Sequence, residues 1–136
     1  MTDQPVVWVV DDDPDDQLLM AMALRQIVPS IQVRFIDDGS ELILLLNELE
    51  SYPRLVILDL NMPVMNGFET LEEIRNIPQY QHLPVVILTT SRNAEDKERS
   101  MALGANGYYT KPANHNQTIN IVSELVRHWQ LHDSAR

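Results

Sequence analysis

Runs of apolar residues without polar alternation mark three places in the chain, at residues 6–10, 55–58 and 85–88. A strand that is buried on both faces has this pattern, and such strands belong to parallel sheets covered by helices. Two further segments complete the set. Residues 31–36 alternate in part and predict a strand at the edge of the sheet, and residues 108–110 predict a short last strand.

Segments with apolar residues at helical spacing separate these strands. Capping and breaking residues set their limits, because Asp, Asn and Ser favour helix starts whereas Gly and Pro favour helix ends. Asn93 and Asp96 form a capping-box-like pair at one of these starts. The helices are expected from the N-cap Asp13 to before Pro29, over 41–50, from Phe68 to before Pro78, from Asn93 to before Gly104, and over 121–129.

Five strands that alternate with five helices predict an α/β fold, a (βα)5 doubly wound five-stranded parallel sheet with helices on both faces. Right-handed crossovers are expected to connect the strands. No repeat, low-complexity tract or linker interrupts the pattern. We therefore expect residues 1–136 to form a single domain, with a core over about 5–130 and a short polar tail at the carboxyl end.

Composition and charge narrow the possible functions. The chain of 136 residues is 44% hydrophobic, yet no apolar run approaches the roughly 18 residues of a membrane span. The amino-terminal residues do not resemble a signal peptide, and there is no cysteine for a disulfide, so we expect a cytoplasmic protein without membrane attachment. A net charge of −10 would repel phosphate backbones and argues against nucleic-acid binding.

Chemically active side chains follow the predicted strands. Asp11 and Asp12 follow the first strand, Asp59 the third, Thr89 the fourth and Lys111 the fifth. Because the carboxyl ends of parallel strands meet at one edge of the sheet, we expect these groups to converge there. The nearby acids at 13, 15 and 16 are assigned to a different task, capping the first helix and interacting with its dipole.

Converging carboxylates without cysteine suit a hard divalent cation, above all Mg²⁺, which prefers oxygen ligands. The Lys111 ammonium and the Thr89 hydroxyl are groups that can neutralise and hydrogen-bond phosphate oxygens. The combination predicts phosphoryl transfer onto a carboxylate, with Asp59 as the nucleophile that forms an acyl phosphate.

Four motifs at these strand ends occur together: VVDDD at 9–13, DLNMPVMNG at 59–67, LTTS at 88–91 and GYYTKP at 107–112. With these four motifs in this order, the chain resembles a response regulator receiver domain (CheY-like) of two-component signalling over essentially its full length. The resemblance implies the flavodoxin-like strand order 2-1-3-4-5 and a stand-alone receiver without an output domain. It also implies a phosphorylation-dependent switch and not an enzyme in the usual sense, because such a domain catalyses only its own Mg²⁺-dependent phosphorylation and dephosphorylation.

The resemblance also implies a role for each matching residue. Asp59 would accept a phosphoryl group from the phosphohistidine of a sensor histidine kinase or a phosphotransfer protein. Asp12 would bind Mg²⁺ directly, Asp11 largely through water, and Asn61 through its backbone carbonyl. Lys111 and Thr89 would contact the phosphoryl oxygens, and the peptide bond between Lys111 and Pro112 would be cis.

Tyr108 matches the switch aromatic of the family. In that scheme Thr89 moves toward the phosphoryl group, the Tyr108 ring turns inward, and the face of the fourth helix, fifth strand and fifth helix changes shape for a downstream protein target. The resemblance leaves the oligomeric state as monomer or weak homodimer. One departure from the family is Thr90, where a small alanine is common, and we expect it to restrict access to the phosphoryl group.

Alternative functions remain open at this level. A phosphatase of the haloacid dehalogenase kind also uses a strand-end aspartate, but it needs a second acid two residues later, where this chain has Asn61. A receiver-like binding module that is never phosphorylated is a further alternative. His128 and His132 share a helical face and could bind a metal, although histidines near a helix end more often interact with the helix dipole.

Overall fold

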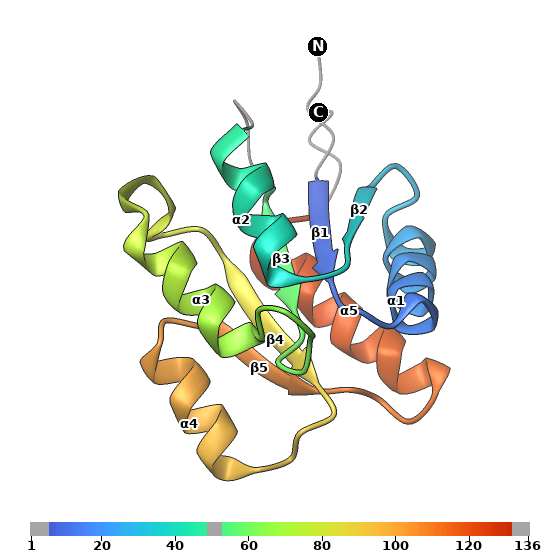
Figure 1. The fold of residues 1–136 in the computed structure, drawn as a ribbon. Helices are drawn as coiled ribbons and strands as arrows, with labels where there is room; N and C mark the ends of the chain where they lie inside the picture. The colour runs from blue at the N-terminus through green and yellow to red at the C-terminus, as the bar shows by residue number, and fades with distance from the viewer. Residues whose placement is uncertain (1–5, 49–52, 132–136) are drawn as a thin grey trace.

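The computed structural model describes residues 6–48 and 53–131, and within them the chain forms one five-stranded parallel sheet (Figure 1). The strand order is β2-β1-β3-β4-β5, as expected, and the partly alternating strand β2 lies at an edge. The strands are β1 (Val6–Val10), β2 (Gln32–Ile36), β3 (Leu55–Leu58), β4 (Val85–Thr89) and β5 (Gly107–Thr110).

Helices follow each strand within the same described ranges. They are α1 (Pro14–Ile27), α2 (Gly39–Glu48), α3 (Gly67–Asn76), α4 (Ala94–Ala102) and α5 (His115–Trp129), with a short 3₁₀ helix, η1 (Pro78–Tyr80), after α3. The expected end of the second helix at residue 50 and the expected polar tail from residue 132 onward lie outside the described residues. The last helix begins at His115 and not at residue 121, because the Asn114 side chain caps it by accepting from the N–H of Gln117.

The sheet separates two apolar layers, because consecutive strand residues point to opposite faces. On one face Val7 and Ile57 pack with Leu24 of α1 and Leu125 of α5. The layer on the other face is formed by α2, α3 and residues of the sheet such as Trp8 and Leu58. All four residues of β3 are buried, which confirms the interpretation of its unalternated sequence.

The helix starts carry the expected caps, with one difference. The Asp13 carboxylate accepts from the backbone N–H of Asp15 at 2.9 Å at the start of α1. Asn93 caps α4, but the expected reciprocal bond from Asp96 is wrong: the Asp96 carboxylate accepts from the Ser91 hydroxyl at 2.6 Å. The Asp side chain is one methylene shorter than the Glu that closes such a box, and the Ser91 hydroxyl accepts from the Asn93 N–H instead.

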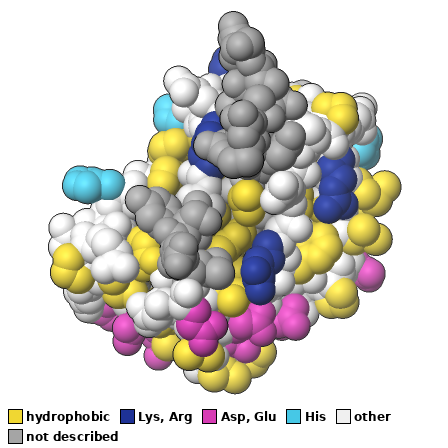
Figure 2. All heavy atoms as spheres, turned by 90° about the horizontal axis from the view of Figure 1, so that it is seen from above, with side chains coloured by type: hydrophobic (Ala, Val, Ile, Leu, Met, Phe, Trp, Pro, Cys, Tyr) yellow, Lys and Arg dark blue, Asp and Glu magenta, His cyan; other side chains and the backbone are white. Residues whose placement is uncertain are grey.

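None of the helices within residues 6–48 and 53–131 has the length and the apolar composition that a membrane span requires. Figure 2 views the molecule from above, toward the end where the chain of Figure 1 enters β1. In this view Lys and Arg side chains are scattered, whereas Asp and Glu side chains lie mainly along one margin. On this face of the molecule, the acidic side chains are therefore unevenly distributed.

The start of α3 lies against the strand end that carries Asp59. The Gly67 N–H donates to the Leu60 carbonyl at 2.9 Å, and a Cβ at Gly67 would lie 2.4 Å from the Asp59 carbonyl oxygen. Since backbone and not a flexible side chain occupies that space, only glycine allows the helix to approach this closely.

Gly67→Ala is therefore expected to lower the free energy of unfolding by about 1–3 kcal/mol, because the new methyl group must push α3 away from β3. Urea unfolding followed by circular dichroism measures the loss. Gly107→Ala is the control, since the nearest atoms to its Cβ belong to the Val86 side chain, at 3.3 Å, and not to the backbone. An equal loss in both variants would contradict the proposed close approach.

Candidate functional site

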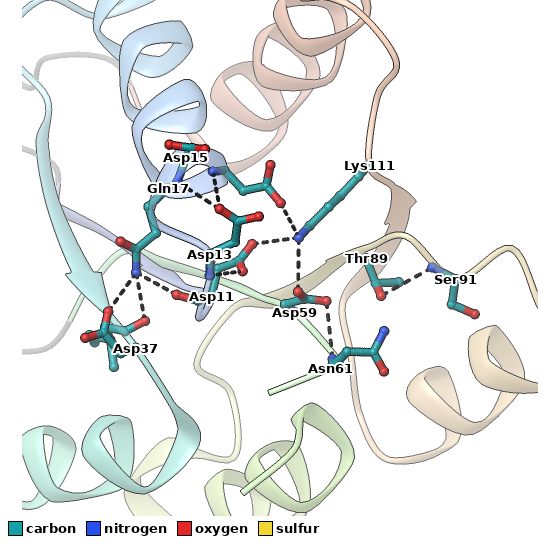
Figure 3. A network of polar contacts seen from close by, with 12 residues as sticks. Asp11, Asp13, Asp15, Gln17, Asp37, Asp59, Asn61, Thr89, Ser91 and Lys111 are labelled. Carbon is teal, nitrogen blue, oxygen red and sulfur yellow. Dashed lines mark hydrogen bonds and ion pairs between the residues drawn. The ribbon is translucent and has the colours of Figure 1, made fainter. Parts of the chain in front are cut away.

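Backbone hydrogen bonds of the sheet bring the expected site residues to one edge (Figure 3). The Asp59 N–H donates to the Val10 carbonyl at 3.0 Å, so Asp59 lies beside the end of β1 and next to Asp11. The Lys111 N–H donates to the Thr89 carbonyl at 2.7 Å. Residues that are far apart in the sequence are thus placed together by the ends of four parallel strands.

Three carboxylates form a cluster that could hold a cation. One carboxylate oxygen from each of Asp11, Asp12 and Asp59 lies within 4.8 Å of the others. Asp11 and Asp59 are each 5% exposed, whereas Asp12 is exposed to solvent. This donor set is entirely oxygen and has one side open to water, which suits a hard divalent cation that retains part of its hydration shell.

The burial of Asp11 has an electrostatic consequence. Desolvation raises the pKa of this carboxyl above its ordinary value, and the charge of Asp59 acts in the same direction. Hydrogen bonds from Lys111 and from the Asp13 N–H oppose the shift without cancelling it. Burial therefore makes ionisation of Asp11 costly, and a bound cation would relieve that cost.

Lys111 lies among three carboxylates. Its Nζ is 2.7 Å from Asp16, 2.8 Å from Asp11 and 3.1 Å from Asp59, and its side chain is 13% exposed. Burial alone would lower the pKa of Lys111, but hydrogen bonds to Asp11 and Asp16 and the charge of Asp59 outweigh burial and raise it. Lys111 is therefore a permanent cation beside Asp59.

Two polar residues of α1 have contacts that the sequence interpretation missed. Asp16 was assigned only to the helix start, yet its carboxylate bonds Lys111. Gln17 is buried, and its side-chain amide donates to the Asp11 carbonyl at 2.6 Å and to the Asp37 carboxylate at 3.1 Å. The signal for Asp16 was its position in the first turn after Asp11 and Asp12, which places it at the same edge of the sheet.

Thr89 lies near the cluster, but its hydroxyl has a different contact. Thr89 is fully buried at the end of β4, and its Oγ1 accepts from the Ser91 N–H at 3.4 Å. The Tyr108 hydroxyl donates to the Ser91 carbonyl at 3.1 Å, so Ser91 contacts both of the residues expected to form the switch. Thr90 is exposed. Tyr108 and Tyr109 pack on opposite faces of the sheet, as expected for neighbours in a strand.

A backbone N–H of the loop after β3 contacts the Asp59 side chain. The Asn61 N–H donates to Asp59 Oδ1 at 3.4 Å. Further along, the Met65 N–H donates to the Pro63 carbonyl at 2.7 Å and closes a tight turn around Val64. Val64 has a φ of 67°, which is strained for a β-branched residue, so the turn must be maintained by its neighbours.

Two remaining expectations have different outcomes. The expected cis bond between Lys111 and Pro112 is wrong, since this bond is trans in the structure. A bond before proline is compatible with either isomer, so the residue pair alone could not decide between them. His132 lies outside the described residues, and the ring of its proposed partner His128 packs edge-on against Trp129.

Asp11→Asn is expected to raise the free energy of unfolding at neutral pH by on the order of 1 kcal/mol, because it removes a buried charge while Lys111 keeps two partners. The sign follows from the raised pKa. Below its ordinary pKa of 3.8, Asp11 is protonated in both the folded and the unfolded state and does not lower the free energy of unfolding. The destabilisation grows as pH rises from there through the pKa of the folded state.

Urea unfolding of the wild-type chain and of Asp11→Asn, from below pH 3.8 to neutral pH, measures how the difference in stability depends on pH. Asp12→Asn is the control: Asp12 is exposed, so this substitution should change the free energy of unfolding little. Lower stability of Asp11→Asn at neutral pH would show that the ion pair with Lys111 outweighs desolvation.

Comparisons with known proteins agree with this geometry. Residues 7–123 match the family model of the response regulator receiver domain. The response regulator Rcp1 of a Synechocystis species is 32% identical over 129 residues, which cover 91% of this chain and 88% of that protein.

Solved structures show the same likeness. The phosphorylated cyanobacterial phytochrome response regulator RcpA is 32% identical with a TM-score of 0.87, over 98% of this chain and 100% of that one. The Mn²⁺-bound form of response regulator Rcp1 is 30% identical with a TM-score of 0.81, over 92% and 94% of the two chains. Both the sequence motifs and the fold lead to one conclusion: the chain belongs to the response regulator receiver domain family of two-component signalling.

Proposed function

We propose that Asp59 is the residue that accepts a phosphoryl group from the phosphohistidine of a sensor histidine kinase or a phosphotransfer protein. Members of this family are phosphorylation switches with histidine kinase partners. The observation that carries the assignment is the place of Asp59 directly after the carboxyl end of the central strand β3. Asp11 and Asp12 flank it from β1, and Lys111 reaches it from the far side of β4.

The chemistry is an in-line displacement at phosphorus. A carboxylate oxygen of Asp59 forms the new P–O bond while the P–N bond to the donor imidazole breaks, and the electron pair of that bond leaves with the ring nitrogen. Asp59 becomes an acyl phosphate. Negative charge gathers where three carboxylates already lie, so the reaction depends on positive charge supplied at the site.

The residues present fit Mg²⁺ as the source of part of that charge. Asp12 would hold it directly, Asp11 through water, and Asn61 through its backbone carbonyl. The oxygen-only cluster supports this assignment, as does the Mn²⁺ bound by the related Rcp1. A bound divalent cation would neutralise phosphoryl oxygens and the developing acyl phosphate.

Lys111 and Thr89 complete the contacts to the phosphoryl group in this proposal. Lys111 is already charged and 3.1 Å from Asp59. The Thr89 hydroxyl accepts a long hydrogen bond, 3.4 Å, from the Ser91 N–H. Such a bond costs little to exchange for a charged phosphoryl oxygen.

Tyr108 provides the route from the site to the surface. The Ser91 carbonyl accepts a hydrogen bond from the Tyr108 hydroxyl. Movement of Thr89 and Ser91 toward the phosphoryl group therefore changes the contact that holds the Tyr108 ring. Tyr108 belongs to β5, and the face of α4, β5 and α5 is where we place the downstream protein target. Phosphorylation then shifts a two-state equilibrium by the difference in its contacts with the two states.

Incubation with Mg²⁺ and a small phosphodonor such as acetyl phosphate should add one phosphoryl group per chain, and Asp59→Asn should add none. The amide of that variant is isosteric but is not a nucleophile of comparable strength. Intact-protein mass spectrometry measures the addition. Equal modification of the variant would overturn the assignment of Asp59, and no modification of the wild-type chain would overturn the proposed function.

Chelation of divalent cations should abolish this modification. Asp12→Ala should raise the Mg²⁺ concentration required for it by roughly tenfold or more, since loss of even an outer-shell partner of a metal costs that much. Because Asp12 is exposed, the variant should stay folded. Titration of Mg²⁺ against the phosphorylation rate checks both statements. An unchanged requirement would remove Asp12 from the cation site.

A further inference from the structure

The ion pair between Asp16 and Lys111 joins two distant parts of the chain. Asp16 lies in the first turn of α1, and Lys111 lies 95 residues later at the end of β5. At 2.7 Å this is the shortest of the three contacts that Lys111 Nζ makes with carboxylates. The receiver-domain motifs recognised in the sequence include no role for Asp16.

The environment of this pair strengthens it. The Asp16 and Lys111 side chains line a small cavity of about 60 Å³, together with Asp11, Asp59 and apolar residues that include Leu19 and Pro112. An apolar wall lowers the local dielectric and makes an ion pair stronger than one in open water. The Asp16 side chain is 35% exposed, so it has this advantage only in part.

Asp16 differs from the other two partners of Lys111 in one respect. Asp11 and Asp59 belong to the carboxylate cluster that would hold the cation, whereas Asp16 does not. A lysine ammonium has three N–H donors, and its three carboxylate neighbours can occupy all of them. A cation at the cluster would repel the ammonium and compete for Asp11 and Asp59, and phosphorylation would change Asp59 itself. The contact with Asp16 can persist through both events.

We propose that Asp16 is a positioning residue that anchors the Lys111 ammonium beside the phosphoryl site while Asp11 and Asp59 engage the cation and the phosphoryl group. This inference rests on the proposed phosphorylation of Asp59. A lysine side chain has considerable rotamer freedom, and an anchor fixed on α1 removes part of the entropic cost of placing it. Without the anchor, Lys111 stays on Asp11 and Asp59 and competes with the cation.

Asp15 provides a matched control. It is the neighbouring acid in the same first turn, it is exposed, and its backbone N–H, like that of Asp16, donates to Asp13. Asp15→Asn and Asp16→Asn therefore remove the same charge from the same helix end, but only the second removes the contact with Lys111. If Asp16 served only the helix dipole, the two variants would behave alike.

Two measurements on the full chain test the proposal. Calorimetric titration with Mg²⁺ should give weaker binding for Asp16→Asn than for Asp15→Asn. At saturating Mg²⁺, Asp16→Asn should be phosphorylated by acetyl phosphate roughly tenfold more slowly than Asp15→Asn, the change that a coupling of about 1.4 kcal/mol produces. Asp16→Glu keeps the charge and should restore most of the rate.

The same comparison in a Lys111→Ala background shows whether Asp16 acts through Lys111. There, Asp16→Asn and Asp15→Asn should have equal Mg²⁺ affinities. Urea unfolding confirms that each variant is folded, and Asp16→Ser replaces Asp16→Asn if the latter is not. Equal rates and affinities for the Asp15 and Asp16 variants, or a full Asp16 effect without Lys111, would overturn the positioning role. Loss of phosphorylation in the wild-type chain would instead overturn the proposed function.

Discussion

The site depends on the close approach of like charges at one edge of a parallel sheet. Asp11 and Asp59 are buried beside each other, and Lys111 is the cation that makes this arrangement tolerable in the described structure. Desolvation still raises the pKa of Asp11, so the compensation is incomplete. A site with excess negative charge suits a divalent cation, and this excess charge supports the proposed phosphoryl transfer to Asp59.

The rest of the fold maintains this arrangement. The bond from the Asp59 N–H to Val10 sets β3 beside β1, and the close packing of Gly67 on the Asp59 backbone fixes the loop beyond it. Gln17 ties the end of β1 to the end of β2. Rigid strand ends and short backbone contacts thus hold charged side chains that would otherwise separate, which is the kind of preorganisation that phosphoryl transfer requires.

The sequence was sufficient for the fold and for much of the site, because both follow from local patterns. Unalternated apolar runs predicted three buried parallel strands, and each run was followed by an acid or a hydroxyl that the structure places at the common edge. The Lys111 ammonium, which follows the short last strand, reaches the same edge. The contact of Asp16 with Lys111 could not be derived in this way, since it depends on how far two side chains reach across the folded site. The start of α5 was missed because residues 115–120 carry little apolar periodicity, and the cap at Asn114 decides it.

We propose that Asp59, directly after β3, and no neighbouring acid, becomes phosphorylated. The direct measurement is to phosphorylate the protein with Mg²⁺ and acetyl phosphate, reduce the acyl phosphate with borohydride, and locate the resulting homoserine by peptide mass mapping. The account predicts homoserine at Asp59 and unmodified aspartate at Asp11, Asp12 and Asp16. Homoserine at any of those three positions, with Asp59 unmodified, would contradict it.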